Sequence, residues 1–185
     1  MTKIYTVSPG DGFEWVFLHN HEDFEALLEL GVERVSESFQ PLSAYRILED
    51  EGETFRQADL PWIGSHFLVM RDHVREILEP VMADNVEFLP LQTDDGIQLW
   101  ITHTLRQVPV LDLERSELKR FASSGRIMRI VRHHFLPAVV KAGSAFHLTN
   151  MKRGNLYLSE KVVDAVLQAD LTGPKFTEIW DTEDS

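Results

Sequence analysis

The hydrophobic positions at the start of the chain form two short segments separated by a polar turn. Residues 3–7 and 13–18 are rich in aromatic and β-branched side chains, which favour strands. The residues between them, 8–12, include proline, aspartate and two glycines, all of which favour turns. The pattern therefore predicts a β-hairpin over residues 3–18.

The next segment changes to a helical spacing and then loses its periodicity. Residues 21–30 place their apolar side chains on one stripe and are followed by Gly31, which predicts a short helix. Residues 32–60 have too few apolar positions to predict an element. Within them, the acidic run 49–53 predicts an exposed loop.

The pattern is stronger from residue 66 onward. Residues 67–70 form a short apolar run, typical of a buried strand. Residues 74–81 follow with helical spacing, and Pro80 predicts a kink or an end in the last turn of that helix. Apolar residues return over 86–91 and predict a second strand.

A hairpin and two further elements are expected after this strand. Asp94-Asp95-Gly96 predicts a tight turn, because Asp-Gly supplies the positive φ angles that such turns need, and residues 97–101 alternate as the returning strand. Residues 112–121 are typical of a short helix capped by Asp112. Residues 126–132 are ambiguous, but their β-branched content favours a strand.

Two parts of the chain resemble each other. A shift of 88 residues brings His66–Leu91 into gapless register with Gly154–Ile179, and each copy has the pattern strand, helix, strand. Either the chain contains an internal repeat, or both segments share a pattern common to all such units. We expect a single α+β domain over residues 1–185, with a mixed or antiparallel sheet, short helices and two similar strand–helix–strand units.

Composition narrows the classes of function. The chain has 185 residues, no cysteine and a net charge of −12. The absence of cysteine excludes disulfides, thiol catalysis and cysteine-ligated metals. The negative charge argues against a nucleic-acid partner, and no apolar run is long enough for a membrane span. We therefore expect a soluble, cytoplasmic protein.

The charge is concentrated near the N-terminus. Residues 1–60 contain 13 acidic and 4 basic side chains, whereas residues 126–185 contain 7 and 8. An acidic run is either a solvated surface or a surface that attracts a basic partner. For the second case, the candidate partner-binding residues are Glu33, Glu37, Glu49, Asp50, Glu51 and Glu53.

No motif in the chain indicates catalysis or a cofactor. Nucleophile elbows, phosphate loops and dinucleotide-binding glycine patterns are absent from the sequence. His19 and His21 could both face a metal ion, but no third ligand follows at a fixed spacing, so an ordinary polar turn is favoured. Arg126, Arg129 and Arg132 are interpreted as partners for the excess of acidic side chains. We expect no enzyme activity, cofactor or metal.

The order of short segments over residues 60–180 resembles a bacterial family, immunity protein family eleven of polymorphic toxin systems. The matching segments are Leu60-Pro61-Trp62, Phe67–Pro80, Val86–Pro90, Leu111–Glu117, Gly125-Arg126-Ile127 continuing to Pro137, Phe146–Leu148, Leu156–Glu160, Leu171–Gly173 and Phe176. Residues 1–60 match nothing in that family pattern, and we treat them as an acidic, variable N-terminal part.

The resemblance implies a protein that binds and neutralises a cognate toxin. Many toxins of such systems are basic and act on nucleic acid, and an acidic inhibitor would be attracted to such a toxin. Two alternatives stay open. One is a regulatory or structural interaction module without a toxin partner, and the other is a small hydrolase or metal enzyme without a recognised motif.

Overall fold

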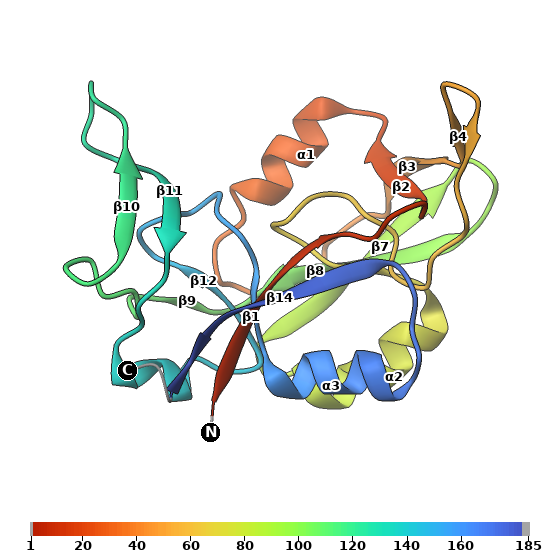
Figure 1. The fold of residues 1–185 in the computed structure, drawn as a ribbon. Helices are drawn as coiled ribbons and strands as arrows, with labels where there is room; N and C mark the ends of the chain where they lie inside the picture. Colours follow the sequence, from red (N-terminus) through yellow and green to blue (C-terminus); the bar gives the residue numbers. More distant parts are fainter. Residues whose placement is uncertain (1, 183–185) are drawn as a thin grey trace.

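Two five-stranded sheets form the frame of the protein, shown by a computed structural model that describes residues 2–182 (Figure 1). The first sheet has the strand order β2 (Trp15–Leu18), β3 (Leu42–Ile47), β7 (Val86–Thr93), β8 (Gln98–Thr104) and β6 (Val69–Met70). The second has the order β14 (Pro174–Asp181), β1 (Lys3–Pro9), β13 (Tyr157–Ser159), β12 (Ala145–Leu148) and β9 (Gln107–Val108). The pairs β3–β7 and β9–β12 are parallel and the others are antiparallel, so both sheets are mixed.

Three α-helices and one short 3₁₀ helix accompany the sheets. They are α1 (His21–Leu28), α2 (Asp72–Met82), α3 (Glu160–Gln168) and the 3₁₀ helix η1 (Pro137–Lys141). The expected α+β class is confirmed. Helices α1 and α2 lie where the sequence predicts helices, but α2 continues through Pro80 to Met82. Within residues 2–182, no helix combines the length and the apolar character that a membrane span requires.

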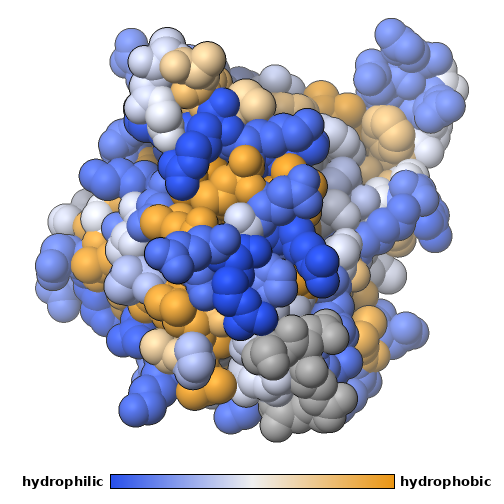
Figure 2. All heavy atoms as spheres, turned by 60° about the vertical axis from the view of Figure 1, so that its left-hand side comes forward, coloured by the Kyte–Doolittle hydropathy of each residue, from blue (hydrophilic) through white to orange (hydrophobic). Residues whose placement is uncertain are grey.

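Two small hairpins project from this frame on opposite sides of α1 (Figure 1). One is formed by β4 (Glu49–Asp50) and β5 (Glu53–Thr54), the other by β10 (Glu117–Arg120) and β11 (Ile127–Arg132). Figure 2 brings the side with β10 and β11 forward and shows apolar side chains in separate patches between hydrophilic ones. The two hairpins are therefore the most prominent appendages of the surface.

The two strand–helix–strand units have the same arrangement. In each unit the two strands flank a third strand that is antiparallel to both, β8 in the first unit and β1 in the second. The elements of the second unit start 88 positions after those of the first, at Tyr157, Glu160 and Pro174 compared with Val69, Asp72 and Val86. The sequence similarity therefore corresponds to a structural repeat.

The predicted hairpin over residues 3–18 is wrong. Strand β1 pairs with β13 and β14, whereas β2 pairs with β3 in the other sheet. In the second unit, β1 takes the place that β8 has in the first, and Lys3 lies opposite Asp181 at the ends of the chain. The apolar pattern identifies both strands correctly, but the partner of each strand is far away in sequence.

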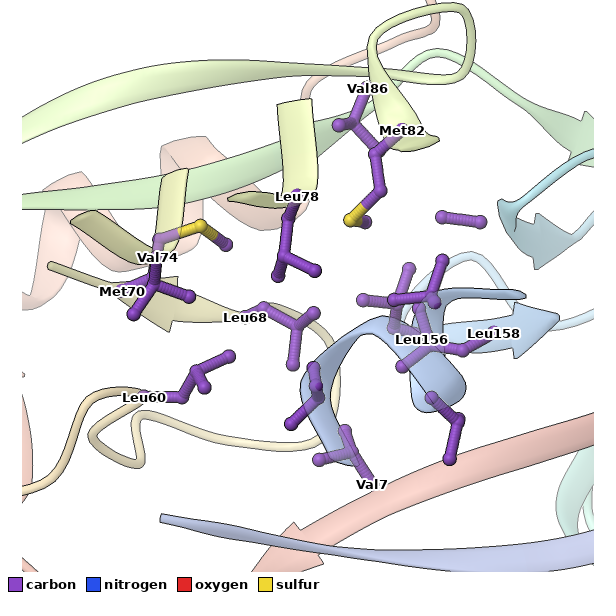
Figure 3. Close-up of a cluster of buried hydrophobic side chains, with 14 of the residues drawn as sticks. Val7, Leu60, Leu68, Met70, Val74, Leu78, Met82, Val86, Leu156 and Leu158 are labelled. Atoms are coloured by element: carbon purple, nitrogen blue, oxygen red, sulfur yellow. The ribbon is translucent and has the colours of Figure 1, made fainter. Parts of the chain in front are cut away.

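Helices α2 and α3 pack side by side and join the two units. Their buried faces share one hydrophobic cluster with strands of both sheets (Figure 3). Leu78 of α2 and Val162 of α3 are fully buried there. Two further clusters lie around Phe146 and Tyr157 in the second sheet and around Val16 and Leu89 in the first.

The predicted helix over residues 112–121 is also wrong, whereas the strand over 126–132 is confirmed. Asp112 Oδ1 accepts hydrogen bonds from the backbone N–H groups of Glu114 and Arg115, both at 3.0 Å, but this cap begins only one turn. The chain then enters β10, in which Leu118 lies opposite Ile130 of β11. Both side chains pack on the second hydrophobic cluster, and a helix over the same residues would break this pairing.

Candidate functional site

The β4–β5 hairpin presents four of the six candidate carboxylates. Glu49, Asp50, Glu51 and Glu53 are all exposed, and none forms an ion pair with another residue in the range 2–182. The expectation of exposure is correct, but the segment is a tight hairpin in which Glu51 has a positive φ of 47°. Asp50 lies directly opposite Glu53. Because like charges in that position repel each other, the hairpin keeps a concentrated negative field at a cost in stability.

Glu33 and Glu37 are exposed on a different segment, the loop between α1 and β3. The buried carboxylate of Glu87 anchors this loop by accepting hydrogen bonds from the N–H groups of Val35 at 2.7 Å and Ser36 at 3.2 Å. Burial acts to raise the pKa of Glu87, but these bonds and His103 at 2.8 Å outweigh it and lower that pKa.

The structure therefore does not bring all six carboxylates together. The loop is attached near the start of β7, whereas β3 runs parallel to β7 and reaches its far end before the hairpin begins. An eight-residue strand such as β7 is about 25 Å long at the usual rise per residue. Glu33 and Glu37 thus lie at the opposite end of the sheet from the hairpin.

A row of aromatic side chains lies next to the hairpin on the outer face of β2 and β3. We call Trp15, Phe17, Tyr45 and Trp62 the aromatic strip. The ring centroids of Trp15 and Phe17 are 6.2 Å apart, those of Phe17 and Tyr45 5.8 Å, and those of Trp15 and Trp62 6.5 Å. Trp15 is 37% and Phe17 39% exposed, unusually high values for such large apolar side chains.

The strip is open because α2 covers only the other half of this sheet face. Met70, Phe88 and Trp100, from β6, β7 and β8, pack into the cluster of α2, whereas no helix within residues 2–182 covers the outer face of β2 and β3. A hollow of about 220 Å³ adjoins the strip and is lined partly by Phe17, Leu18 and Phe24. An exposed aromatic row beside a hollow is typical of the centre of a protein–protein interface.

The aromatic strip is continuous with the β4–β5 hairpin, which we call the acidic hairpin. Trp15 lies opposite Ile47 at the end of β3, and Glu49 follows two residues later. The exposed carboxylates therefore form a charged edge to an apolar centre. The sequence indicates the carboxylates by their composition but did not lead us to predict the strip, although Trp15 and Phe17 stand two residues apart, a spacing that indicates a shared strand face.

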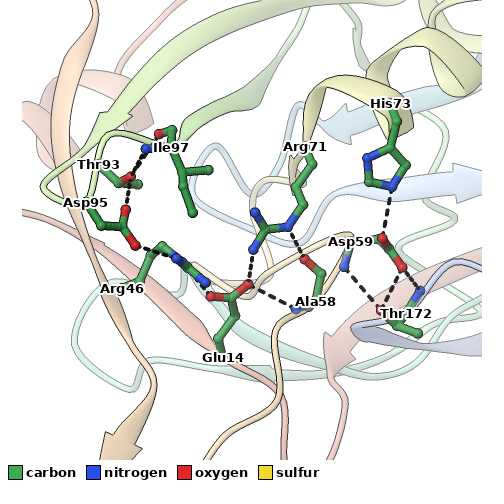
Figure 4. A network of polar contacts seen from close by, with 10 residues as sticks. All are labelled: Glu14, Arg46, Ala58, Asp59, Arg71, His73, Thr93, Asp95, Ile97 and Thr172. Carbon is green, nitrogen blue, oxygen red and sulfur yellow. Dashed lines mark hydrogen bonds and ion pairs between the residues drawn. The ribbon is translucent and has the colours of Figure 1, made fainter.

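A buried ionic network holds the opposite face of β2 and β3 in place (Figure 4). Glu14 is fully buried and accepts hydrogen bonds from Arg46 Nε at 2.6 Å, Arg71 Nη2 at 2.7 Å and the Ala58 N–H at 2.9 Å. Arg46 also pairs with Asp95 in the turn between β7 and β8. Burial acts to lower the pKa of Arg46, but the two carboxylates outweigh it and raise that pKa.

The same region is tied to the second repeat unit through Asp59. Its carboxylate accepts bonds from the Thr172 N–H at 2.8 Å and hydroxyl at 2.7 Å and lies 2.9 Å from His73 Nε2. These contacts lower the pKa of Asp59 although its burial acts in the other direction. The strands below the aromatic strip are therefore rigidly connected to both units, which suits a preorganised binding surface.

His19 and His21 do not face a common point. His19 Nε2 lies 2.8 Å from the carboxylate of Asp94, and His21 Nε2 lies 3.7 Å from Glu25 on α1. Among residues 2–182, no group of three or more histidine, aspartate or glutamate side chains is placed to hold a metal ion. The geometry gives these two histidines local polar contacts.

A comparison with family models identifies the relationship. The model described as an immunity protein family, Imm11, matches residues 16–181. The chain belongs to this family. No curated protein matches the chain.

Membership in Imm11 implies a toxin partner in general and suggests a non-enzymatic role. The match begins at residue 16, so it includes β2 except for Trp15, the other three residues of the aromatic strip and the acidic hairpin. The expectation that residues 1–60 lie outside the family pattern is wrong for residues 16–60, because the family match includes them. The acidic hairpin is thus part of the Imm11 region.

The three arginines interpreted as partners for acidic side chains do not have that role in this Imm11 protein. Arg126 lies before β11, while Arg129 and Arg132 lie on it, and all three are exposed. None of them forms an ion pair within the described part of the chain. The interpretation is wrong because the acidic side chains lie mainly on other segments, so the positive charge of the β10–β11 hairpin stays uncompensated.

A second polar feature that sequence analysis missed is a set of buried histidines. The rings of His66 and His147 stack with centroids 3.9 Å apart, and each Nδ1 donates to a backbone carbonyl, of Gly154 and Asn155. Burial lowers the pKa of His147 to about 3 and also lowers that of His66. The lowered pKa keeps both imidazoles neutral at pH 7. Their role is structural, because each binds a carbonyl of the loop that precedes β13.

Proposed function

We propose that this Imm11 protein neutralises a cognate bacterial toxin in the cytoplasm by binding it through the aromatic strip and the acidic hairpin. The observation that carries the proposal is the family match together with an open aromatic face bordered by four unpaired carboxylates. An inhibitor of this kind needs a rigid, complementary surface and no catalytic centre.

The two parts of the surface have different tasks. The aromatic strip supplies apolar area that becomes buried in the complex, and Trp and Tyr are enriched among residues that dominate binding energy. The carboxylates of the hairpin raise the rate of encounter with a positively charged toxin, such as one that acts on nucleic acid. Buried aromatic contacts therefore determine mainly the dissociation rate, and exposed charges mainly the association rate.

The first test is co-expression of this chain with the toxin encoded beside its gene. We expect the wild-type chain to restore growth and to co-purify with that toxin. Failure of both would refute the proposal, and co-purification with a different partner, without rescue of growth, would favour an interaction module unrelated to toxins.

The surface is tested with two double variants of equal charge. Glu49→Lys/Glu51→Lys changes the hairpin, and Glu33→Lys/Glu37→Lys makes the same change in net charge at the far end of the sheet. We expect the hairpin variant to lower the association rate about tenfold at low salt and the control by less than about threefold. Equal effects of the two variants would show that overall charge matters and that the hairpin is not in the interface.

A further inference from the structure

The β10–β11 hairpin is strongly basic in a protein with a net charge of −12. Residues 117–132 contain five basic side chains and one acidic side chain. The inner side chains of this hairpin, Leu118, Ile127 and Ile130, pack on the second hydrophobic cluster and attach the hairpin to the frame.

A groove of about 880 Å³ lies between this hairpin and the loop 149–154. We call it the basic groove, and its main lining residues are Arg120, Phe121, Arg126, Met128, Lys152 and Arg153. Almost all of them are exposed, so the groove is open along its length. An open groove suits an extended chain segment, whereas sites for small molecules enclose most of their ligand.

The cations of the groove differ in how they are held. Arg153 is fixed to α1 by Glu25, at 2.8 Å, and by Glu29, with Nε 2.9 Å from Oε1. Arg126 and Lys152 have no carboxylate within ion-pair distance among residues 2–182, and the guanidinium of Arg120 binds only the carbonyl of Gly125, at 2.9 Å. Arg153 is thus held and neutralised, whereas the hairpin wall and Lys152 offer positive charge that no described carboxylate pairs.

Apolar side chains lie between these cations. Leu113 is 44%, Phe121 45% and Met128 47% exposed, and all three line the groove. Figure 2 shows the corresponding mixture of apolar and hydrophilic patches on this side of the molecule. Large exposed apolar residues interleaved with arginine favour a partner that carries both carboxylates and apolar anchors.

We propose that the basic groove binds an acidic protein segment with apolar anchor residues. The exposed apolar side chains between the cations would stay in contact with water against a phosphate backbone, whereas apolar anchors of a protein segment would bury them. The β10–β11 hairpin, which forms one wall of the groove, lies on the other side of α1 from the acidic hairpin (Figure 1), so this site is separate from the proposed toxin-binding surface and does not rest on it.

The test uses fluorescence anisotropy with defined probes. A labelled random copolymer of glutamate and tyrosine represents an acidic segment with apolar anchors, and polyglutamate represents charge alone. A DNA duplex and vesicles of phosphatidylglycerol with phosphatidylcholine represent the other anionic partners. We expect the full-length chain to bind the copolymer more tightly than any other probe, and to lose affinity as salt is added.

Three variants localise the binding. Arg126→Glu/Lys152→Glu should weaken copolymer binding about tenfold, whereas Lys141→Glu/Lys161→Glu, the same charge change at exposed lysines outside the groove, should alter it less than about twofold. Phe121→Ser/Met128→Ser should reduce affinity for the copolymer to that for polyglutamate. Because all these side chains are exposed, the variants should fold, and circular dichroism checks this.

Several results would overturn the proposal. They are no binding of the copolymer, equal loss in the groove variant and its lysine control, or tighter binding of the duplex or the vesicles. None of these results depends on the toxin, so toxin neutralisation by the groove variant Arg126→Glu/Lys152→Glu is measured separately. If this variant restores growth as well as the wild type does but no longer binds the copolymer, the two sites are independent.

Discussion

Acidification should destabilise this protein through two buried histidines before its carboxylates begin to titrate. Burial lowers the pKa of His147 to about 3 and that of His133 to about 4, from an ordinary value of 6.5. His133 Nε2 forms a hydrogen bond of 3.1 Å with the hydroxyl of Tyr157. The folded state therefore holds both imidazoles unprotonated, whereas the unfolded chain binds a proton at each below about pH 6.5.

The size of the effect follows from these values. When the folded pKa lies below the unfolded pKa, stability is complete above the unfolded pKa and is lost as the pH falls toward the folded one. One pKa unit corresponds to about 1.36 kcal/mol, so at pH 5 each histidine favours unfolding by about 2 kcal/mol. Together they remove about 4 kcal/mol, a large part of the total stability of about 5–15 kcal/mol that is usual for a domain.

The assay is urea unfolding at pH 7, 6 and 5, with variants that cannot titrate. His147→Asn keeps a donor for the carbonyl of Asn155, and His133→Gln keeps a polar partner for Tyr157. The double variant should lose about 4 kcal/mol less than the wild type between pH 7 and pH 5, and His21→Asn, an exposed control, should behave as the wild type. Parallel pH profiles of the wild type and the double variant would refute the reasoning, because the remaining groups are common to both.

Three further predictions concern the free energy of unfolding, measured by urea denaturation at pH 7. Glu14→Gln should cost about 3–5 kcal/mol, since it leaves the buried Arg46 and the partly exposed Arg71 without the carboxylate that they share; a loss below about 1 kcal/mol would mean that the network is unimportant. Gly173→Ala should cost at least about 2 kcal/mol, because its φ is +128° and a Cβ would lie 2.1 Å from the Leu60 carbonyl oxygen, whereas Gly31→Ala meets no atom and should be nearly neutral. Leu78→Ala should cost about 2–5 kcal/mol and the exposed neighbour Ile77→Ala less than about 1 kcal/mol, and similar losses for both would contradict the assignment of the helix faces.

Elements defined by local chemistry could be predicted from the sequence. The turn Asp94-Asp95-Gly96 joins β7 and β8 as expected, since the positive φ of Gly96, 80°, depends on the residue itself. Helix α2 follows from the apolar spacing of residues 74–81, of which Val74 and Leu78 lie on its buried face. In both cases the decisive interactions lie within a few residues of each other.

The wrong predictions concern elements whose decisive contacts come from residues far away in the sequence. The partners of β1 are more than 150 residues away, and no property of residues 3–9 distinguishes them from the nearby segment 13–18. The expected helix over 112–121 fails because the pairing of Leu118 with Ile130 buries both on a distant cluster. Competition between a local turn and a long-range strand pair is decided by burial that the local sequence does not encode.

The candidate surface was predictable in its charge but not in its apolar part. Exposure of the run Glu49–Glu53 follows from its composition, because four adjacent carboxylates are not buried without partners. In β2, however, Trp15 and Phe17 alternate with Val16 and Leu18, so both faces of the strand look buried. Only the position of α2, which stops short of β2, leaves one face open.

The arrangement of the repeat suggests where partner specificity is encoded. Both units and the shared cluster of α2 and α3 are built from buried side chains, so changes there are costly to stability. The acidic hairpin precedes the first unit and the basic hairpin lies between the two, and each contributes mainly exposed residues. Substitutions at these hairpins can therefore alter charge with little effect on folding, as surface substitutions usually do. A scaffold with two hairpins of opposite charge can change its partners through substitutions in the hairpins alone. Beside the acidic hairpin, the rigid ionic network around Glu14 holds β2 and β3 in place during such changes.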